Sequence, residues 1–379
     1  MKKIRLGDIA TLITKGTTPT TIGFSFVDTG VNFVKIESIS ENGEFLSDKF
    51  AHITDECDNK LKRSQLEEND ILFSIAGAIG RTAIVPRSIL PANTNQALAI
   101  IRIPQNAINL RFVLYALQSQ AVEEQSEKQK QGVAQLNLSL KNIADILIPL
   151  VSSEKQDEIV RNLAAVDTAI AIRKEQIRLI DQVVKSRFIE LFGDPEQNPM
   201  VWTKQPLSEI IINANNGMAR RGNDPHGSIV MRLVELQDGH IDYSTPNRIV
   251  LTDTEKGKYL LRENDFLFAR VNGNPEYVGR CAVFHEIGEP VYHNDHIIRV
   301  HFDDTVLNGA FASALINSAY GKRQMRGQIK TSAGQYTISQ DGIGAITAIL
   351  PPMALQQQFA AFVEQVDKSK LCGRMEVAA

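Results

Sequence analysis

The sequence has 379 residues, of which 43% are hydrophobic and 22% charged, and this length allows two or three domains, each with a buried core. Its three cysteines are far apart and none forms a Cys-x-x-Cys pair, so neither a disulfide framework nor a cysteine zinc site is indicated. The formal net charge of −3 carries no global signature of nucleic-acid binding, although basic residues can still gather on one face.

We expect no targeting or membrane segment. The first residues, Met1 to Arg5, are basic but continue into Leu6-Gly7-Asp8 without the apolar run of a signal peptide. The longest largely apolar stretch, Ile71 to Ile79, is too short to span a bilayer. These features predict a soluble, cytoplasmic protein whose thiols are reduced.

The first half of the chain mixes strand and helix patterns. Short β-branched runs at 71–75 and 99–103 predict strands, and the apolar spacing from Leu110 to Glu127 predicts a helix. Gly and Pro residues mark the loops between these elements. The pattern is typical of an α+β domain with a twisted, mostly antiparallel sheet.

A long helix is predicted next, because the stretch from Ser153 to Phe192 contains neither Gly nor Pro. Its apolar residues recur at alternating spacings of four and three, which favours a coiled coil over a lone surface helix. A helix of some 40 residues is about 60 Å long. Gly193 and Pro195 end it. The residues expected to pack along this spacer helix are Ile159, Leu163, Val166, Ile170, Ile177, Ile180 and Val184.

The second half of the chain repeats the first with a period of about 195–200 residues. Several blocks match in the same order, which makes chance an unlikely cause and predicts two similar domains. The matching segments are 6–9 with 207–210, 66–73 with 261–268, 80–85 with 279–284, 95–103 with 294–300, and 146–149 with 346–351.

A second, shorter helix follows Pro351-Pro352 and is the natural antiparallel partner of the first. Its expected packing residues are Leu355, Phe359, Phe362 and Val366. The pattern fades after 366–370, so we expect an irregular tail, and a part of the long helix from about Ile170 to Leu191 without an intrachain partner. The expected regions are a first domain at 1–150, a helical spacer at 151–195, a second domain at 196–350, and a short helix with its tail at 351–379.

Taken together, these motifs resemble the specificity subunits of type I restriction–modification systems, over nearly the whole chain. The resemblance rests on the repeated Leu-x-x-Asn-Asp-[Ile/Phe]-Leu-Phe block, on the 146–149 segment that leads to Gln156, on the helix end at 186–195, and on the second helix start at 351–356. The resemblance implies two target-recognition domains, each reading one half of a bipartite DNA site, with helices that set the gap. It also implies two copies of a separate adenine methyltransferase subunit, a separate motor-nuclease subunit, and no catalytic site or cofactor in this chain. Members of the family usually have a second helical region about as long as the first, so this chain is expected to be a truncated variant with impaired assembly. The unpartnered part of its long helix would be covered by the methyltransferase, by another copy of this chain, or not at all.

Residues that could contact double-stranded DNA are cations and small polar side chains in probable loops. In the first half they are Lys15, Thr17, Thr18, Lys35, Ser74, Arg81, Asn95, Lys128 and Lys130. In the second half they are Arg220, Arg221, Arg232, Arg270, Asn272, Arg280, His293, Asn294 and Lys330. An isolated surface cation is more often simply solvated, and the strongest candidates are Arg220-Arg221 and the loop at 270–273, which combine cations with adjacent glycine. The repeated Asn69-Asp70 and Asn264-Asp265 are instead interpreted as turn residues at the start of a strand.

Three catalytic or ligand-binding interpretations are weaker. The segment 274–277 resembles the Asn-Pro-Pro-Tyr box of amino-methyltransferases but has Glu276 in place of the second Pro, and a turn is the simpler account. His285, His293 and His296 lack a further ligand that would complete a metal site. The glycine loop at 77–82 lacks the Lys-[Ser/Thr] ending of a P-loop. A self-contained DNA methyltransferase or nuclease therefore remains the alternative to a DNA-recognition subunit.

Overall fold

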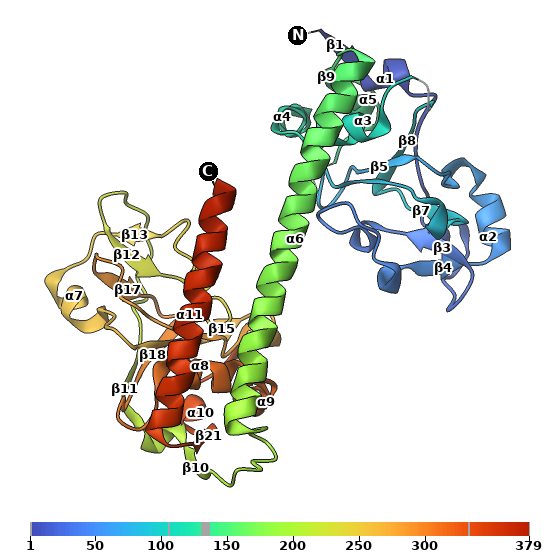
Figure 1. Cartoon of the computed structure of the whole chain (residues 1–379). Coiled ribbons are helices and arrows are strands. Elements are labelled where there is room, and N and C mark those ends of the chain that lie inside the picture. Colours follow the sequence, from blue (N-terminus) through green and yellow to red (C-terminus); the bar gives the residue numbers. More distant parts are fainter. Residues whose placement is uncertain (1, 105–106, 130–136, 333, 379) are drawn as a thin grey trace. The chain divides into compact units, whose positions relative to one another are not determined.

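The structure is a computed structural model that describes residues 2–104, 107–129, 137–332 and 334–378. The chain divides into two compact units, Met1–Ala171 and Ile172–Ala379, and helix α6 (Ser153–Phe192) contributes residues to both (Figure 1). Each unit combines small, mostly antiparallel sheets with short helices, in agreement with the predicted α+β class. None of the helices within the described ranges combines the length and hydropathy needed to cross a bilayer.

The first unit is built on two sheets. The four-stranded antiparallel sheet has the order β2 (Leu12–Lys15), β8 (Leu98–Arg102), β5 (Ile71–Ser74) and β6 (Thr82–Ile84). The three-stranded sheet has the order β4 (Ala51–Ile53), β3 (Val31–Val34) and β7 (Ala92–Thr94), and its β3–β7 pair is parallel. Alternate residues of β5 and β8 enter two different hydrophobic clusters. Both faces of the central strands are therefore buried, which explains their continuous apolar runs.

The first and last strands of this domain pair with each other. β1 (Lys3–Arg5) is antiparallel to β9 (Leu147–Pro149), so the chain enters and leaves the domain at the same place. The helices of the unit, besides α6, are α1 (Leu6–Ile9), α2 (Asp55–Lys60), α3 (Leu110–Leu117), α4 (Gln120–Gln129) and α5 (Leu140–Ala144).

The second unit repeats this topology. Its four-stranded sheet has the order β11 (Ile211–Asn216), β18 (Ile297–Phe302), β14 (Phe266–Ala269) and β16 (Cys281–Val283). Its three-stranded sheet has the order β13 (Arg248–Ile249), β12 (Ser228–Met231) and β17 (Val291–His293), again with one parallel pair, β12–β17. The outer strands β10 (Thr203–Pro206) and β21 (Thr347–Leu350) close the domain. The predicted repeat is therefore present as a repeated strand order.

The remaining elements of the second unit include one sheet without a described counterpart in the first. It has the order β15 (Val271–Asn272), β20 (Gln335–Thr337) and β19 (Lys330–Ser332). The helices are α7 (Asp253–Tyr259), α8 (Gly309–Asn317), α9 (Ala319–Gln328), α10 (Gln340–Gly344) and α11 (Met353–Ala378).

The repeated Asn-Asp pairs form the turns that lead into β5 and β14, as predicted. Asn69 and Asn264 have φ angles of 72° and 64°, a left-handed conformation that asparagine tolerates better than most residues. The following carboxylates, Asp70 and Asp265, each accept a hydrogen bond at 2.8 Å from the backbone N–H three residues earlier. Burial of both carboxylates in polar contacts makes these turns part of the framework.

The helix predicted from Leu110 to Glu127 is divided into α3 and α4. The division falls at Ser119, whose hydroxyl donates to the Ala116 carbonyl, and the second unit has the same division at Ser318, whose hydroxyl donates to the Leu315 carbonyl. A serine that bonds the backbone in this way competes with helix continuation.

Helix α6 has the predicted bounds, but the expectation for the second spacer helix was wrong. α11 continues to Ala378, where an irregular tail was expected. The stretch after residue 366 contains no Pro, and its single Gly373 costs a helix only about 1 kcal/mol relative to Ala. The fading heptad pattern therefore did not end the helix.

The part of α6 without an intrachain partner was also predicted incorrectly. In the second unit, Phe359 of α11 lies 5.6 Å from the ring of Phe188 and 5.7 Å from that of Phe192, and Arg187 lies over Phe362. Because β21 pairs with β10, α11 begins beside the end of α6 and runs antiparallel to it, so it covers the end that was expected to be bare.

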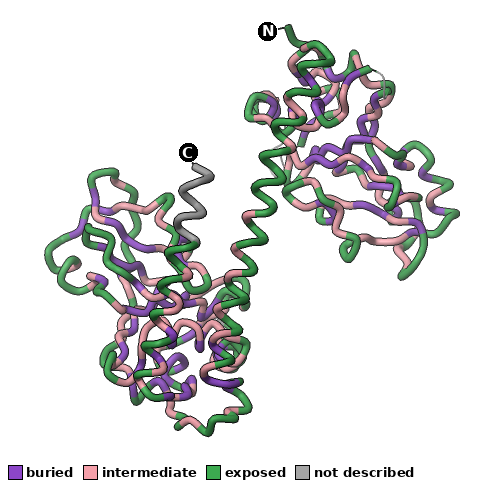
Figure 2. The backbone as a smooth tube through the Cα atoms, viewed as in Figure 1, coloured by how far each residue is buried: buried purple, intermediate pink, exposed green. Residues whose placement is uncertain are grey.

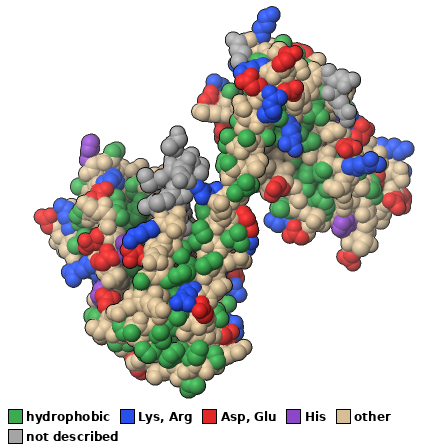
Figure 3. Space-filling model, viewed as in Figure 1, with side chains coloured by type: hydrophobic (Ala, Val, Ile, Leu, Met, Phe, Trp, Pro, Cys, Tyr) green, Lys and Arg blue, Asp and Glu red, His purple; other side chains and the backbone are tan. Residues whose placement is uncertain are grey.

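The predicted packing residues nearer the start of α6 are the exposed ones. Leu163, Val166 and Ile170 are 39%, 53% and 42% exposed, although Ile159 packs against the first unit's core. Figure 2 colours much of α6 as exposed, and Figure 3 shows hydrophobic side chains on its surface. Ile177, Ile180 and Val184 are partly buried, as are Leu355, Phe362 and Val366 of α11. Among the side chains that the structure describes, the predicted coiled-coil packing is thus present at the end of α6 that α11 covers.

Candidate nucleic-acid interface

The candidate DNA-contacting residues of each unit centre on its one parallel strand pair. β3 and β7 place Val34 opposite Thr94, so Lys35 and Asn95, the next residues, lie side by side at the carboxyl ends of the strands. β12 and β17 likewise place Met231 opposite His293, followed by Arg232 and Asn294. We call residues 95–96 and 294–296 the asparagine steps of the two units.

A second segment, the opening loop at 15–18 or 217–221, packs directly on the asparagine step. Gly16 N–H donates to the Asn95 carbonyl at 3.1 Å, and Met218 N–H donates to the His293 carbonyl at 3.1 Å. A Cβ atom on Gly16 would lie 1.8 Å from the Thr94 carbonyl oxygen, and one on Gly217 would lie 2.2 Å from that of Asn294. Glycine is therefore required at both positions by the close approach of two backbones.

The side chains that join the opening loop to the asparagine step differ between the units. In the first unit the Thr18 hydroxyl donates to the Gln96 side-chain carbonyl. In the second unit the Arg221 guanidinium lies 2.7 Å from the Asp295 carboxylate and 3.2 Å from the His296 ring. The same backbone construction therefore presents neutral hydrogen-bonding groups in one unit and an ion pair in the other. Gln96, Asp295 and His296 were not among the predicted DNA contacts, although Gln96 and Asp295 directly follow the repeated asparagines and His296 is the next residue after Asp295.

Two more segments of the second unit join this surface. Arg270 donates from its backbone to the His296 carbonyl at 2.8 Å and from its guanidinium to the Asp295 carbonyl at 3.1 Å. Asn272 pairs with Tyr336 in the β15–β20–β19 sheet, which also carries the exposed Lys330. In the first unit the corresponding segment includes Lys130, which lies outside the described residues, whereas Lys128 is described and exposed at the end of α4.

Most of the predicted arginines are already paired. Arg220 binds both carboxylate oxygens of Glu255, at 3.1 and 2.7 Å, and Arg232 forms an ion pair with Glu235, which is buried. Lys35 lies 4.4 Å from the centroid of the Phe26 ring. Among the described residues, Lys15, Lys128 and Lys330 are exposed cations with no carboxylate within ion-pair distance. These three lysines can meet phosphate without first losing a partner.

The arginines that follow the repeated glycine at the β5–β6 and β14–β16 turns connect the two sheets of their units. The Arg81 guanidinium donates to the carbonyls of Ile36 and Ile39, the latter at 2.7 Å. Arg280 lies 3.0 Å from the Asp238 carboxylate and 4.5 Å from the centroid of the Tyr277 ring. These contacts hold the segments that follow β3 and β12, so both arginines stabilise the fold beside the candidate interface.

Three predicted contacts are buried and cannot reach a ligand in this conformation. The hydroxyl of Ser74 accepts from Arg81 N–H at 2.8 Å and donates to the Ala78 carbonyl, which closes the loop after β5. Asn294 accepts at its side chain from His296 N–H at 3.1 Å, as Asn95 does from Ala97 N–H at 3.0 Å. The third is His293. Local polarity made all three look accessible, whereas burial depends on the packing of distant segments.

His293 lies wholly inside the second unit. Its Nδ1 is 3.1 Å from the Tyr259 carbonyl, to which it can donate, and its Nε2 has no hydrogen-bond partner. Burial lowers the pKa of this imidazole to about 4, because the charged form loses its hydration there. His285 and His296 bond to Glu263 and Arg221 instead, and no cluster of three or more metal-ligating side chains occurs among the described residues.

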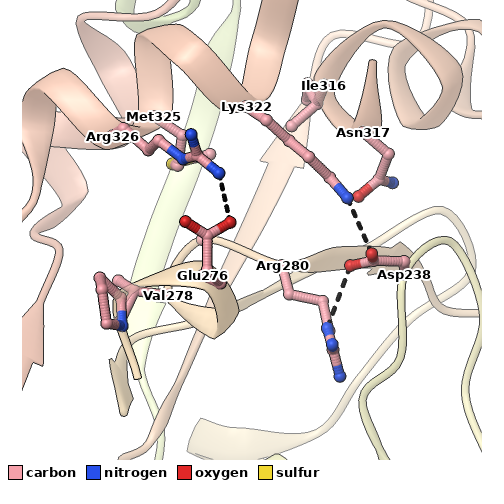
Figure 4. Close-up of a pocket in the computed structure, with 11 residues that line it drawn as sticks. Asp238, Glu276, Val278, Arg280, Ile316, Asn317, Lys322, Met325 and Arg326 are labelled. Atoms are coloured by element: carbon pink, nitrogen blue, oxygen red, sulfur yellow. Dashed lines mark hydrogen bonds and ion pairs between the residues drawn. The ribbon is translucent and has the colours of Figure 1, made fainter. Parts of the chain in front are cut away.

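The segment that resembled a methyltransferase box forms a capped turn. Pro275–Tyr277 is a 3-10 turn in which the Asn274 side chain accepts from Glu276 N–H at 3.0 Å, in agreement with the preferred interpretation. It borders a small cavity of about 50 Å³. The residues that line this cavity form the Glu276–Arg326, Asp238–Arg280 and Asp238–Lys322 ion pairs (Figure 4). A cavity of this size holds one or two waters, whereas a cofactor site needs roughly 300 Å³ or more.

Comparison with known proteins places this fold in a class. Residues 1–182 match the family described as type I restriction modification DNA specificity domain. The chain is 24% identical over 275 residues to the type I restriction enzyme StySPI specificity subunit of Salmonella potsdam, which covers 69% of this chain and 59% of that subunit. It is 23% identical over 327 residues to the EcoKI specificity subunit of Escherichia coli K12, which covers 81% of this chain and 70% of that subunit.

A solved structure has the same fold. The S subunit of a type I restriction–modification system from M. genitalium matches over 100% of this chain and 92% of its own, with a TM-score of 0.51 at 13% identity. At this identity the likeness concerns the fold alone, and it confirms the predicted fold class. Residues 1–182 thus match the DNA specificity domain family, and the resemblance to specificity subunits of type I restriction–modification systems is confirmed.

Proposed function

We propose that this chain is the non-catalytic subunit that recognises DNA sequence for a type I restriction–modification complex. Each unit reads one half of a bipartite site, and the spacer helices set the gap between the half-sites. The observation that carries this proposal is the repeated construction of the interface: in both units the opening loop packs on the asparagine step, with different side chains at the junction. Two similar frameworks with different exposed chemistry suit two different half-sites.

The chemistry of the interface suits duplex DNA. Lys15 and Lys330 supply unpaired charge for phosphates, and the amide and ionic groups of Gln96, Asp295 and Arg221 are of the kinds that read base edges. DNA presents equivalent groove faces one helical turn apart, about 34 Å, which two readers on one spacer can address together.

The relatives are named as specificity subunits of type I restriction enzymes, and the resemblance to them supports partners of the following kinds. Two copies of an adenine methyltransferase subunit would associate with the two halves of this chain, and a motor-nuclease subunit would join them for cleavage. The exposed Leu163, Val166 and Ile170 on α6 support an assembly role, since contiguous exposed apolar side chains are typical of interaction surfaces.

Co-expression with a type I methyltransferase subunit tests the proposal. The purified complex is incubated with genomic DNA and S-adenosylmethionine, and methylated adenines are mapped. The expected result is methylation at one bipartite motif with a fixed gap. Methylation at a continuous motif, or at none when the methyltransferase is bound to this chain, would contradict the proposal.

A self-contained DNA methyltransferase or nuclease is the alternative function, and the purified chain alone distinguishes it. The chain is assayed with DNA, S-adenosylmethionine and Mg²⁺, with no second protein added. We expect no methyl transfer and no cleavage. Turnover by the isolated chain would overturn the non-catalytic role while leaving DNA recognition intact.

A further inference from the structure

Two buried glutamines occupy equivalent places at the start of the two spacer helices. Gln156 lies in the first turn of α6 and Gln356 in the first turn of α11, and their exposed fractions are 6% and 1%. Buried amide side chains must satisfy both ends of the group, because an unpaired buried polar group costs about 1–3 kcal/mol. The hydrogen-bond partners of the two glutamines therefore indicate their role.

Gln156 connects α6 to the start of α3. Its Oε1 accepts from Asn109 N–H at 2.9 Å, and its Nε2 donates to the Val151 carbonyl at 3.0 Å. Asn109 is itself the N-cap of α3, since its side chain accepts from the backbone N–H groups of Arg111 and Phe112. One amide thus joins the strand exit, the first turn of the spacer helix and the cap of a domain helix.

Gln356 makes the same connection in the second unit. Its Oε1 accepts from Asn308 N–H at 2.9 Å, and its Nε2 donates to the carbonyls of Pro351 and Val306, at 2.9 and 3.1 Å. Asn308 is the N-cap of α8, which corresponds to α3. The arrangement therefore recurs in two units whose interfaces differ in chemistry, which indicates a role in geometry and not in base reading.

Further contacts continue the attachment along α6 in the first unit. Asn109 donates from its side chain to Asp157 at 2.8 Å, and the Tyr115 hydroxyl donates to Asp167 at 2.6 Å. Desolvation, together with this hydrogen bond, raises the pKa of Tyr115 to about 12, so the phenol keeps its proton and remains a donor. These two exposed hydrogen bonds add to the attachment that the buried Gln156 makes at the start of α6.

We propose that Gln156 and Gln356 are positioning residues that fix the direction in which each spacer helix leaves its domain, and that they thereby restrict the half-site gap. This inference rests on the proposed function. A change of about 5° at one end of a helix about 60 Å long moves the other end by about 5 Å. That displacement exceeds the rise of one base pair, about 3.4 Å, so small angular freedom is enough to admit a neighbouring gap.

The chain contains a matched control for each glutamine. Gln125 on α4 accepts from Leu147 N–H at 2.9 Å and donates to the Leu147 carbonyl at 3.1 Å, and Gln324 on α9 binds Thr347 in the same way at 2.9 and 3.1 Å. Each control side chain makes a pair of amide-to-backbone hydrogen bonds, and none of these bonds is to a spacer helix. Methionine, which conserves volume, is the replacement in all four positions.

The first measurement uses the full chain without DNA or partner. Spin labels are placed on exposed sites of the domain and of α6, in a Lys141→Cys, Ala169→Cys, Cys372→Ser background, in which Cys57 and Cys281 are buried. We expect a narrow label-to-label distance distribution in the labelled chain that keeps Gln156 and in its Gln125→Met variant. The Gln156→Met variant should give a clearly broader distribution. Gln156→Glu retains an acceptor for Asn109 and should give an intermediate width, and circular dichroism checks that each variant keeps its helix content.

The second measurement uses the complex with the methyltransferase subunit and duplexes whose gaps differ by one base pair. The wild-type chain and Gln125→Met should methylate one gap, whereas Gln156→Met should methylate a neighbouring gap within about tenfold of the first, with both half-sites unchanged. In the second unit the same comparison is made between Gln356→Met and its control, Gln324→Met.

The two measurements separate the possible failures. A distribution as narrow in Gln156→Met as in the wild type would overturn the positioning role. A broader distribution with unchanged gap selectivity would overturn its connection to the gap. A wild-type complex without any bipartite motif would refute the proposed function, while the distance measurement would still decide whether the glutamine fixes the helix.

Discussion

At the scale of single residues, His293 gives the second unit a defined dependence on pH. Its pKa is about 4 in the folded chain, below the ordinary value of about 6.5, so the unfolded chain binds the proton more strongly. The stability that neutral His293 contributes is therefore complete above about pH 6.5 and is lost as the pH falls toward 4, by about 3 kcal/mol in total.

Urea unfolding, followed by the fluorescence of the single tryptophan, Trp202, measures this loss in the second unit. We expect His293→Gln to reduce the difference in unfolding free energy between pH 7 and pH 4.5 by about 2–3 kcal/mol. His226→Gln, which changes an exposed histidine, should retain the full difference. Equal pH dependence in both variants would show that His293 is solvated.

Gly217 supports a second residue-scale prediction. In Gly217→Ala the new methyl group would meet the Asn294 carbonyl at 2.2 Å, so the opening loop must move away from the asparagine step. We expect the complex to lose about tenfold or more in affinity for the second half-site, measured by fluorescence anisotropy with a labelled duplex. Gly257→Ala, where nothing lies within 4 Å of the added atom, should bind as the wild type does. Unchanged affinity in Gly217→Ala would show that the opening loop does not contact DNA.

The sequence located this interface only in part. Glycine and asparagine at fixed places in the repeat predicted the loops that the structure brings together as the candidate interface, because their backbone requirements are local. The burial of Ser74 and His293, and the pairing of Arg221 with Asp295, depend on strands that lie far apart in the chain. No local pattern carries that information, so the predicted list mixed framework residues with accessible ones.

At the scale of the helices, the aromatic contact between α6 and α11 should dominate the stability of the second unit's spacer. Phe359 is fully buried against Phe188 and Phe192, so Phe359→Ala is expected to cost about 3–5 kcal/mol. Leu179→Ala, at an exposed residue of α6 in the same unit, should cost less than about 1 kcal/mol in the isolated chain. Thermal unfolding followed by Trp202 fluorescence compares the two. A small effect of Phe359→Ala would mean that α11 is not docked in solution.

The elements themselves were predictable to different degrees. α6 was predicted with its bounds because forty residues without Gly or Pro and with a heptad pattern leave few alternatives. Its covered end was predicted wrongly, since that depends on the pairing of β10 with β21 and not on the helix sequence. The break at Ser119 was missed because one serine hydroxyl decides it against otherwise favourable apolar spacing.

At the scale of the whole molecule, the two units should recognise their half-sites independently of each other. Replacing residues 1–145 with the corresponding segment of another specificity subunit should change one half-site of the methylated motif and leave the other unchanged. The closure of the first domain by β1 and β9 makes this exchange feasible, because entry and exit of the chain are paired. Mapping of methylated adenines provides the measurement, and a simultaneous change in both half-sites would contradict independent readers.

The internal ion pairs of the interface bear on how such a protein would search DNA. Arg220, Arg221 and Arg232 are neutralised by Glu255, Asp295 and Glu235. Sequence-independent attraction to DNA comes mainly from cations that displace counterions from phosphates, and these three described arginines of the candidate interface are already paired. On the proposed function, encounters with random sequence would therefore be brief. Only a matching half-site would offer Asp295 and its neighbours new partners. Arg221 would then be free to bind the DNA phosphates, and the residence time on DNA would increase.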